Sequence, residues 1–505
     1  MNNLSAQENT PSLPQSVWPA DQMSLLERQA ADAHGLSLYA LMERAGEAVW
    51  QIASRRFPAA QHWLILCGPG NNGGDGYVIA RLALMAGKQV TVLASEDQQA
   101  LPEEAQQARQ AWRAVGDVQS IDTAWPTTYD IVIDALLGNG LNRAPSVALA
   151  AAIEQANQSP APVVAVDVPS GLSAANGAIP GACIQAALTV SLIALRPGLL
   201  TGKARDVVGT LQVATLGLHA WLEKRTAPWQ RIDAAQLINW LPARRATSHK
   251  GDHGKLLLVG GAAGTAGAIR LAGEAALRSG AGLVRVLTHS SNVAPMLTAR
   301  PELMVDELGR DRLEQALAWA DIVVVGPGLG QEKEAQQALE QIENTQKPML
   351  WDADALNLLA FRPQKRQNRV ITPHPGEAAR LLNLKVSDIE SDRLHAAQLL
   401  ARRYGGVVVL KGAGTLIVSE AGEQAIADVG NAGMASGGMG DVLSGIIGSL
   451  MAQGLALFTA ASAGCVVHGA AADQLARHHG MRGMLASDLF SEIRQLVNPG
   501  ITLKE

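Results

Sequence analysis

One glycine-rich stretch of this chain is Asn431-Ala-Gly-Met-Ala-Ser-Gly-Gly-Met-Gly-Asp441, and the apolar segment 442–452 follows it directly. Its glycines permit positive φ and leave backbone N–H groups open to an approaching anion. A helix that begins near Asp441 would direct its positive end toward the same place. The stretch therefore predicts a phosphate-binding loop followed by a buried helix. Asp441 fits either an ordinary residue of the first helical turn or a catalytic base that faces the phosphate.

Composition places the chain among globular α/β proteins. It has 505 residues, of which 48% are apolar and 4% aromatic, and 50 are glycine. That length exceeds one typical core, so we expect two domains. Many glycines with few aromatic residues favour layered α/β structure over a disulfide scaffold or a disordered chain.

Charge and cysteine content narrow the functional classes. Lys and Arg total 41 and Asp and Glu total 46, so the formal charge is −5 and we expect no nucleic-acid partner. The cysteines, at positions 67, 183 and 465, are too far apart for a zinc site or a disulfide framework, which favours the reducing cytoplasm. Residues 1–17 lack the features of a signal peptide. Gly, Ser, Gln and His interrupt the apolar runs 442–452 and 455–472, so we expect buried helices rather than membrane spans.

The first half of the chain alternates predicted strands and helices, as in βαβ units. The predicted strands are 63–67, 89–94, 130–134 and 162–167, and the predicted helices include 77–86 and 103–115. Loops rich in Gly, Asn and Asp follow three of these strands, at 68–76, 137–141 and 167–171. Turns use these residue types in any case, but loops at the carboxyl ends of parallel strands converge on one crevice. Their shared position predicts a binding site.

The same alternation returns in the second half. Two more strands, 189–194 and 211–214, precede the polar stretch 216–231, which we interpret as a domain boundary. A strand at 256–259, a glycine-rich turn at 260–267 and a helix that ends at Arg278 then restart the pattern. The later predicted strands are 283–287, 322–325, 349–352, 370–371 and 407–410, with a hairpin formed by 415–418 and 424–427.

Several polar residues of the second half have two interpretations each. Lys411 ends a predicted strand before glycines, and it fits either a phosphate contact or an exposed turn. His374 lies between two prolines that stiffen its backbone, and it fits either a site residue or a packed turn. His249, Lys250 and His253 are basic enough to contact a phosphate or ribose, whereas no matching carboxylate spacing supports a metal site there.

In their order along the chain, these motifs resemble those of the bifunctional NAD(P)H-hydrate repair enzymes, and the resemblance covers both halves. The matching segments of the first half are 69–76, 134–140 and 166–171. Those of the second half are 249–251 with Gly254, 326–330, 372–377, 411–415 and 431–441. The resemblance implies an NAD(P)H-hydrate epimerase domain over residues 1–225 and an ADP-dependent NAD(P)H-hydrate dehydratase domain over residues 226–505. The implied folds are a Rossmann-like three-layer α/β domain and a ribokinase-like α/β domain.

For the first half, the resemblance implies exchange between the R and S hydrates of NADH and NADPH with the help of a potassium ion. The implied ligands of that ion are Asn72, Asp134 and Ser170, whose oxygens suit a hard cation. Asp167 corresponds to the family's acid–base candidate, and no second acid–base group can be placed. The implied substrate-binding residues are Asn71, Asn72, Gly73, Gly74, Asp75, Gly138, Asn139, Gly140, Leu141, Asn142, Arg143 and Asp167.

For the second half, the resemblance implies dehydration of the S hydrate with conversion of ADP into AMP and phosphate, and with magnesium on the phosphates. Asp441 would be the catalytic base, and the hydrated dinucleotide would contact Ala268, Gly330, His374 and Asp441. The implied ADP-binding residues are Lys411, Gly412, Ala413, Gly414 and Thr415, together with Asn431, Ala432, Gly433, Met434, Ala435, Ser436, Gly437, Gly438, Met439 and Gly440.

Two other functions fit the residues without the resemblance. A ribokinase-like kinase for a small alcohol would use the same second half, and it would leave a stable phosphorylated product. A nucleotide-binding module without turnover would explain the first half, although an apolar or amide residue at 134 or 167 would then be expected and both positions are carboxylates. We further expect a homo-oligomer, because Gly- and Ala-rich α/β surfaces often associate.

Overall fold

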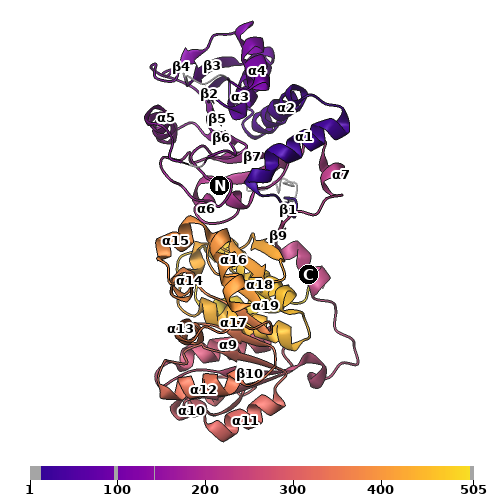
Figure 1. Cartoon of the computed structure of the whole chain (residues 1–505), viewed down its shortest axis with the longest axis vertical. Coiled ribbons are helices and arrows are strands. Elements are labelled where there is room, and N and C mark those ends of the chain that lie inside the picture. The colour runs from indigo at the N-terminus through magenta and orange to yellow at the C-terminus, as the bar shows by residue number, and fades with distance from the viewer. Residues whose placement is uncertain (1–12, 96–100, 142, 501–505) are drawn as a thin grey trace. The chain divides into compact units, whose positions relative to one another are not determined.

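The computed structural model describes residues 13–95, 101–141 and 143–500. The chain divides into two compact units, Met1–Gln230 and Arg231–Glu505 (Figure 1). The expected α/β class is confirmed in both. The predicted boundary stretch contains short elements rather than a plain linker, namely α7 (His219–Leu222) and β9 (Trp229–Ile232).

The sheet of the first unit is parallel, with the strand order β4-β3-β2-β5-β6-β7-β8. Its strands are β2 (His62–Cys67), β3 (Gln89–Ala94), β4 (Gln119–Ser120), β5 (Ile131–Ala135), β6 (Val163–Val166), β7 (Leu188–Leu192) and β8 (Thr210–Ala214). Its helices, besides α7, are α1 (Met23–His34), α2 (Leu38–Arg56), α3 (Asn71–Met85), α4 (Glu103–Arg113), α5 (Val147–Gln158) and α6 (Ala204–Val207). The short strand β1 (Ser16–Val17) pairs antiparallel with residues 229–230.

Alternate side chains of β2 enter two different cores. Trp63 and Ile65 pack with apolar residues of α2, α3 and α4, whereas Leu64 and Leu66 pack with residues of α5. Because strand side chains alternate between faces, the two clusters lie on opposite faces of the sheet. The unit therefore has the three-layer order helix–sheet–helix that the family resemblance implied.

The sheet of the second unit has the order β9-β18-β17-β16-β15-β14-β13-β10-β11-β12. Its strands after β9 are β10 (Lys255–Val259), β11 (Leu283–Thr288), β12 (Met304–Glu307), β13 (Ile322–Val325), β14 (Met349–Trp351), β15 (Arg369–Ile371), β16 (Val407–Leu410), β17 (Thr415–Ser419) and β18 (Gln424–Ala427). β10 to β16 are parallel, and β17 and β18 form the predicted antiparallel hairpin.

The helices of the second unit are α8 (Leu237–Trp240), α9 (Ala266–Arg278), α10 (Ser290–Ala299), α11 (Arg310–Trp319), α12 (Lys333–Glu343), α13 (Asp354–Phe361), α14 (Pro375–Leu382), α15 (Val386–Ser391), α16 (Arg393–Tyr404), α17 (Met439–Ala452), α18 (Leu457–His479) and α19 (Leu489–Leu496). α9, α17, α18 and α19 contribute to one core with alternate strand side chains such as Leu256, Leu258 and Val324.

The helix predicted after Asp441 is α17, which lies at the centre of this core. A Cβ on Gly445 would stand 2.1 Å from the carbonyl oxygen of Ala272 in α9. A Cβ on Gly448 would stand 2.4 Å from Val324 of the sheet. These glycines let α17 approach both neighbours more closely than any side chain would allow.

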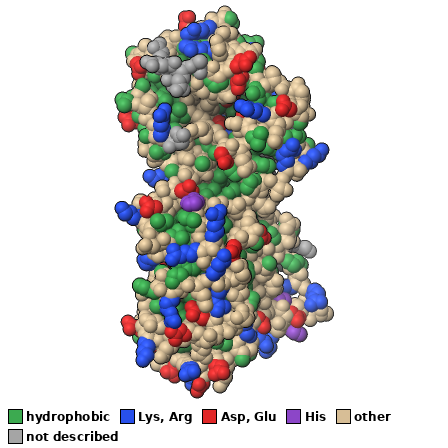
Figure 2. All heavy atoms as spheres, in the orientation of Figure 1, with side chains coloured by type: hydrophobic (Ala, Val, Ile, Leu, Met, Phe, Trp, Pro, Cys, Tyr) green, Lys and Arg blue, Asp and Glu red, His purple; other side chains and the backbone are tan. Residues whose placement is uncertain are grey.

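Two further observations concern the surface and the length of the helices. Positive and negative side chains are interspersed on the face shown in Figure 2. Among the described residues, every helix is too short or too polar to cross a bilayer.

Candidate functional sites

In each unit, the strand order reverses at one point in the sheet. The reversal lies between β2 and β5 in the first unit and between β13 and β10 in the second. Loops that leave the carboxyl ends of strands beside such a point border a crevice where ligands bind. The polar loops predicted from the sequence follow β2, β5 and β6 in the first unit, and β10, β13, β15 and β16 in the second.

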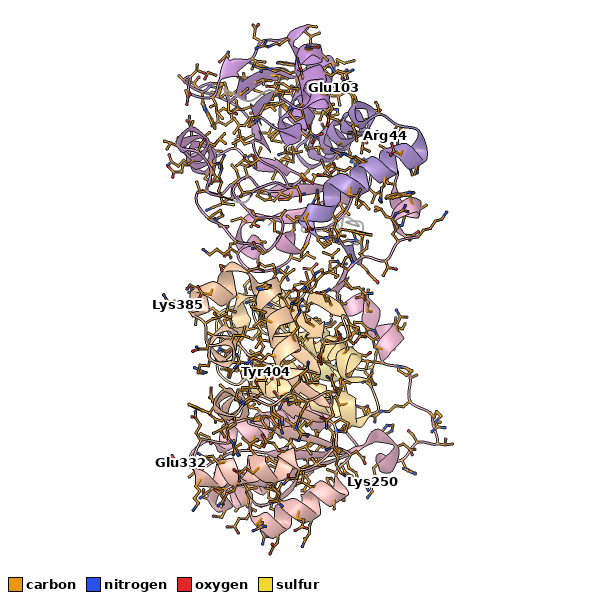
Figure 3. The ribbon with its side chains drawn as sticks, in the orientation of Figure 1. Arg44, Glu103, Lys250, Glu332, Lys385 and Tyr404 are labelled. Atoms are coloured by element: carbon orange, nitrogen blue, oxygen red, sulfur yellow. The ribbon has the colours of Figure 1, made fainter. Side chains whose placement is uncertain are left out.

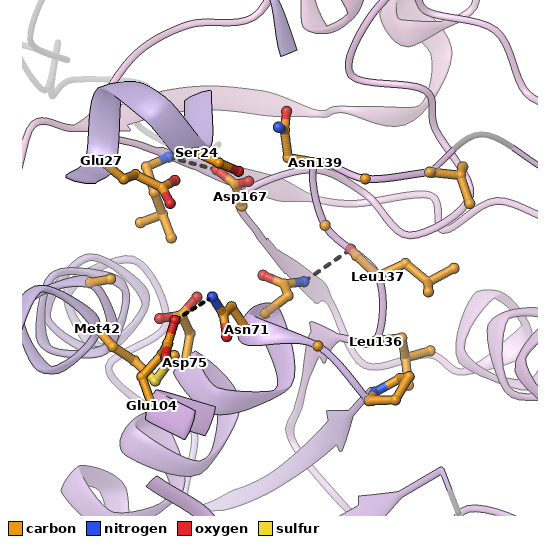
Figure 4. Close-up of a pocket in the computed structure, with 18 of the residues that line it drawn as sticks. Ser24, Glu27, Met42, Asn71, Asp75, Glu104, Leu136, Leu137, Asn139 and Asp167 are labelled. Carbon is orange, nitrogen blue, oxygen red and sulfur yellow. Dashed lines mark hydrogen bonds between the residues drawn. The ribbon is translucent and has the colours of Figure 1, made fainter. Parts of the chain in front are cut away.

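The first unit contains a cavity of about 660 Å³ at this place (Figure 4). Most of the predicted substrate-binding residues line it, namely Asn71, Asn72, Asp75, Gly138, Asn139, Gly140, Leu141, Arg143 and Asp167. Gly73 and Gly74 do not line it, because α3 begins at Asn71 and buries both in its first turns. A Cβ on Gly73 would stand 2.1 Å from the carbonyl oxygen of Gly68, so this glycine permits a tight turn. Asn142 lies outside the described residues.

The predicted cation ligands lie together, and one of them, Asn72, lines this cavity. Asp134, fully buried at the end of β5, accepts hydrogen bonds from the Ser170 hydroxyl at 2.5 Å and the Ser170 N–H at 2.8 Å. Asn72 donates from Nδ2 to the carbonyl of Leu137 at 2.9 Å, and the Leu137 N–H donates to Ser170 Oγ at 2.8 Å. Burial raises the pKa of Asp134 to about 6, against the lowering effect of its hydrogen bonds to Ser170 and Leu136.

One buried atom of this cluster has no hydrogen bond within the described chain. It is Oδ1 of Asn72, a residue that is 8% exposed. An unsatisfied buried oxygen costs free energy, and a bound cation would satisfy it. Among the described residues, no group of three or more His, Cys, Asp and Glu side chains is placed to hold a metal ion. A cation held here would therefore rely on amide, hydroxyl and carbonyl oxygens beside one carboxylate.

Asp167 follows β6 with a φ of 68°, which is strained for a non-glycine residue. Arg196 fixes its carboxylate, with Nη2 at 2.6 Å from Oδ1 and 2.8 Å from Oδ2. The Leu192 N–H also donates to Oδ1, at 3.0 Å. The strained backbone and these contacts hold the carboxylate in the cavity. Two other residues that line the cavity, Ile193 and Leu216, also have a positive φ.

Arg196 was missed by the sequence prediction. It is 1% exposed, and its Nη1 donates to the carbonyls of Leu192 and Ala194 and to the hydroxyl of Ser191. The sequence feature that could have identified Arg196 is its position as an isolated arginine within the apolar run 192–200, since a buried guanidinium needs a partner.

In the second unit, Lys411 follows β16 and interacts with three acids, Asp352, Glu377 and Asp441. Its Nζ is 2.9 Å from Asp352 Oδ1 and 3.8 Å from Glu377 Oε2. Burial alone would lower the pKa of Lys411, but Asp352 and Glu377 raise it above its ordinary value. The ammonium is therefore firmly charged and half-buried, and the alternative of an exposed turn lysine does not describe it.

Asp441 lies in the first turn of α17, and no described side chain pairs with its carboxylate. Burial raises its pKa to about 7, with Asp352 adding to the effect and Lys411 opposing it. The N-cap of α17 is Gly438, with a φ of 87° and no capping side chain, so the first N–H groups of the helix are open to a ligand. A Cβ on Gly440 would stand 3.3 Å from Lys411 Nζ, which places the glycine loop beside the lysine.

The remaining predicted ADP-binding residues divide between the two loops that flank Lys411. Thr415 Oγ1 accepts from the Gly412 N–H at 3.3 Å and closes the 411–415 turn. Asn431 Nδ2 donates to Asp473, and Asn431 Oδ1 accepts from the Gly433 N–H, so this side chain braces the 431–436 loop. Residues 435–437 are exposed. The Met439 side chain points into the core, which leaves only its backbone for a ligand.

The residues predicted to contact the hydrated dinucleotide lie at the ends of three other elements. Ala268 is in the first turn of α9, and the Gly330 N–H donates to Asp354 Oδ2 at 2.8 Å. His374 is the N-cap of α14, where its Nδ1 accepts from the Gly376 and Glu377 N–H groups. Burial and then the charge of Lys411 lower the pKa of His374, which disfavours the protonated ring. The histidine thus caps a helix and borders the Lys411 cluster.

Asp352, Glu377 and Ser444 complete this cluster, and the sequence prediction did not assign them. Asp352 is 1% exposed and accepts from the Ser444 hydroxyl at 2.8 Å as well as from Lys411. The sequence feature that could have identified Asp352 is its position directly after a strand. By contrast, Lys250, which Figure 3 labels, and its neighbours precede β10 and therefore lie at the amino end of that strand, whereas Lys411 follows the carboxyl end of β16.

Comparison with known proteins places both halves in one family. Residues 38–198 match the model of the YjeF-related protein N-terminus, and residues 256–495 match the NAD(P)H-hydrate dehydratase model. The latter match favours a dehydratase over a small-alcohol kinase. A ribokinase-like superfamily protein from Enterococcus faecalis is 30% identical over 54% of this chain and 96% of its own, with a TM-score of 0.50.

Two relatives match along nearly their whole length. The bifunctional NAD(P)H-hydrate repair enzyme Nnr of Escherichia coli K12 is 60% identical over 100% of this chain and 98% of its own. The corresponding enzyme of Vibrio cholerae is 47% identical over 96% of this chain and 99% of its own. With two active-site-like clusters in two α/β units, the chain belongs to the family of bifunctional NAD(P)H-hydrate repair enzymes.

Proposed function

We propose that the first unit exchanges the R and S hydrates of NADH and NADPH, and that the second unit dehydrates the S hydrate at the expense of ADP. The observation that best supports the second activity is the unpaired carboxylate of Asp441 beside Lys411, at the open N-terminus of α17. A base with a pKa of about 7 is suited to proton transfer at neutral pH.

In this proposal Asp441 takes the proton of the C6 hydroxyl, and the hydroxyl oxygen attacks the terminal phosphoryl group of ADP. AMP leaves and a phosphate ester forms at C6. The N1 electron pair then expels phosphate, and loss of a proton from C5 restores the dihydropyridine ring. Hydroxide is a poor leaving group and phosphate is a good one, which explains why a dehydratase would use a kinase-like fold.

Lys411 and the helix N-terminus would bind the phosphates. The ammonium offers point charge, and the N–H groups of α17 offer aligned donors. Magnesium on the nucleotide would offset the developing negative charge. Asp352 and Glu377 supply carboxylate oxygens of the kind that this ion takes directly or through water.

In the first unit, Asn72, Asp134 and Ser170 would hold potassium. The unpaired Asn72 Oδ1 supports this proposal, because the ion would satisfy an oxygen that the described chain leaves without a hydrogen bond. The ion would supply positive charge beside the buried Asp134 and join the first turn of α3, the end of β5 and the loop after β6.

A single assay tests both activities. The full chain is incubated with a mixture of R and S hydrates, magnesium and ADP, and the absorbance of the reduced nicotinamide is followed. Complete recovery is expected with potassium present, and recovery of only the S fraction is expected within the assay time when potassium is replaced by a larger organic cation. A stable phosphorylated product, with no recovery of absorbance, would contradict the proposal.

A further inference from the structure

Glu27 is an acid of the first cavity that none of the sequence motifs includes. It lies on α1 and lines the cavity together with Asp167. Figure 4 shows both side chains reaching into the cavity, Glu27 from the helix and Asp167 from the end of β6. No described residue forms a hydrogen bond or an ion pair with the Glu27 carboxyl group.

The two carboxyl groups have opposite surroundings. Asp167 is held by both oxygens to Arg196 and also accepts the Leu192 N–H. Glu27 has no such partner, and burial raises its pKa to about 7, with the negative charge of Asp167 adding to this effect. Glu104 also raises the pKa of Glu27, whereas Arg196 and Arg28 lower it. Two neighbouring acids whose environments differ in this way are suited to opposite roles in proton transfer.

A third acid, Asp75, also lines the cavity but is less accessible. It is 7% exposed, in α3, and burial raises its pKa, followed by the charges of Asp167 and Glu27. Glu104 is occupied by a hydrogen bond from Asn71 Nδ2 at 3.0 Å. Of the acids that line this cavity, Glu27 has a carboxyl group that is accessible and that forms no hydrogen bond or ion pair with a described residue.

We propose that Glu27 is the second acid–base residue of the epimerisation, acting opposite Asp167. This inference rests on the proposed epimerase activity. Inversion at C6 can proceed by opening of the hydroxylated ring. Asp167 takes the proton of the C6 hydroxyl, and the O–H electron pair forms the second bond between C6 and oxygen, which gives an aldehyde. The C6–N1 electron pair moves to N1, which takes the proton of Glu27. Rotation and closure on the other face return both protons.

The test uses the full chain, pure R hydrate and no ADP, with chromatographic separation of R and S. After the uncatalysed exchange has been subtracted, kcat/KM of Glu27→Gln should be lower than that of the wild type by a factor of about 10² to 10⁴, the usual contribution of a general acid. Wild-type kcat/KM should decline as the pH rises through about 7, because Glu27 must carry its proton. That decline should be absent in Glu27→Gln and should return, at lower activity, in Glu27→Asp.

Asp32→Asn is the matched control. Asp32 is an exposed acid on the same helix and outside the cavity, so this variant should keep the wild-type rate and pH profile. If the wild-type chain exchanges the epimers and Glu27→Gln does so with the same rate and pH profile, the role of Glu27 alone is overturned. Loss of the high-pH decline in Asp75→Asn instead would assign the role to Asp75. Failure of the wild-type chain to exchange epimers would overturn the proposed epimerase activity and this inference with it.

Discussion

Asp441 and Asp352 lie near the same lysine, but their surroundings differ. Asp352 is nearly inaccessible and accepts hydrogen bonds from Lys411 and Ser444. Asp441 has no described partner, and its burial, together with the charge of Asp352, keeps its pKa near 7. Asp352 therefore fixes the position of the lysine, while Asp441 remains available to exchange a proton with a ligand.

Asp441→Asn tests that division of roles. The variant should bind ADP about as tightly as wild type, since Lys411 and the helix N-terminus remain. Its dehydration rate should fall by roughly 10² to 10⁴, because the base is lost. Calorimetric titration with ADP and an absorbance assay with S hydrate measure the two quantities. Near-normal dehydration would exclude Asp441 as the base.

The pH dependence of dehydration should report the same residue. Asp441 must be ionised to accept a proton, so kcat/KM should be low in acid and rise as the pH passes through about 7. A profile of kcat/KM for S hydrate at saturating ADP checks this expectation. A rate that stays constant from pH 5.5 to 8 would contradict it.

At the scale of elements, α17 connects the site to the core. Its N-terminus belongs to the Lys411 cluster, while its later turns contact α9 and the sheet through glycines. Helix interiors disfavour glycine, so these positions are explained by close packing and not by helix propensity. The same packing holds the N-terminus of α17, and thus Asp441, in a fixed place.

Gly445→Ala should therefore destabilise the second unit. The added Cβ would overlap the Ala272 carbonyl, and overpacking of this kind costs about 1–3 kcal/mol. Scanning calorimetry should show a lower transition for the second unit and an unchanged one for the first. Gly267→Ala is the control, because Gly267 is an exposed helical glycine with open space around it and should be neutral or slightly stabilising. Equal stability of the two variants would refute this account of α17.

At the scale of the whole molecule, two units with separate cores and separate sites share one chain. The first site borders the point where the strand order of its sheet reverses, whereas the Lys411 cluster follows β14, β15 and β16, on one side of the reversal in the second sheet. The proposed reactions are consecutive, because only the S hydrate is dehydrated and the R hydrate must first be converted.

Variants in one unit should accordingly spare the other activity. Asp167→Asn should abolish enzymatic epimerisation yet recover the S fraction of a mixed hydrate with ADP at the wild-type rate. Asp441→Asn should equilibrate R with S and recover almost no reduced nicotinamide. Mixing the two variants should restore complete recovery, as followed by absorbance and by chromatography. A loss of S dehydration in Asp167→Asn would show that the sites depend on each other.

The sequence by itself determined the α/β class, nearly all central strands and the loops that border both sites. Its information is local, because apolar runs and glycine-rich turns report on strand, loop and helix start at the positions where they occur. It placed some helix starts too late, since the glycines of 71–76 belong to α3 and not to a loop. The short strands β1, β4, β9 and β12 also went unpredicted.

Only the tertiary structure decided which charges meet. Arg196 with Asp167, Lys411 with Asp352, and Glu27 within the first cavity come from elements far apart along the chain. Burial and neighbouring charges then set the pKa of Asp441 and Glu27 near 7. The physical reason is that solvation and Coulomb energies depend on distances in space, which the order of residues does not contain.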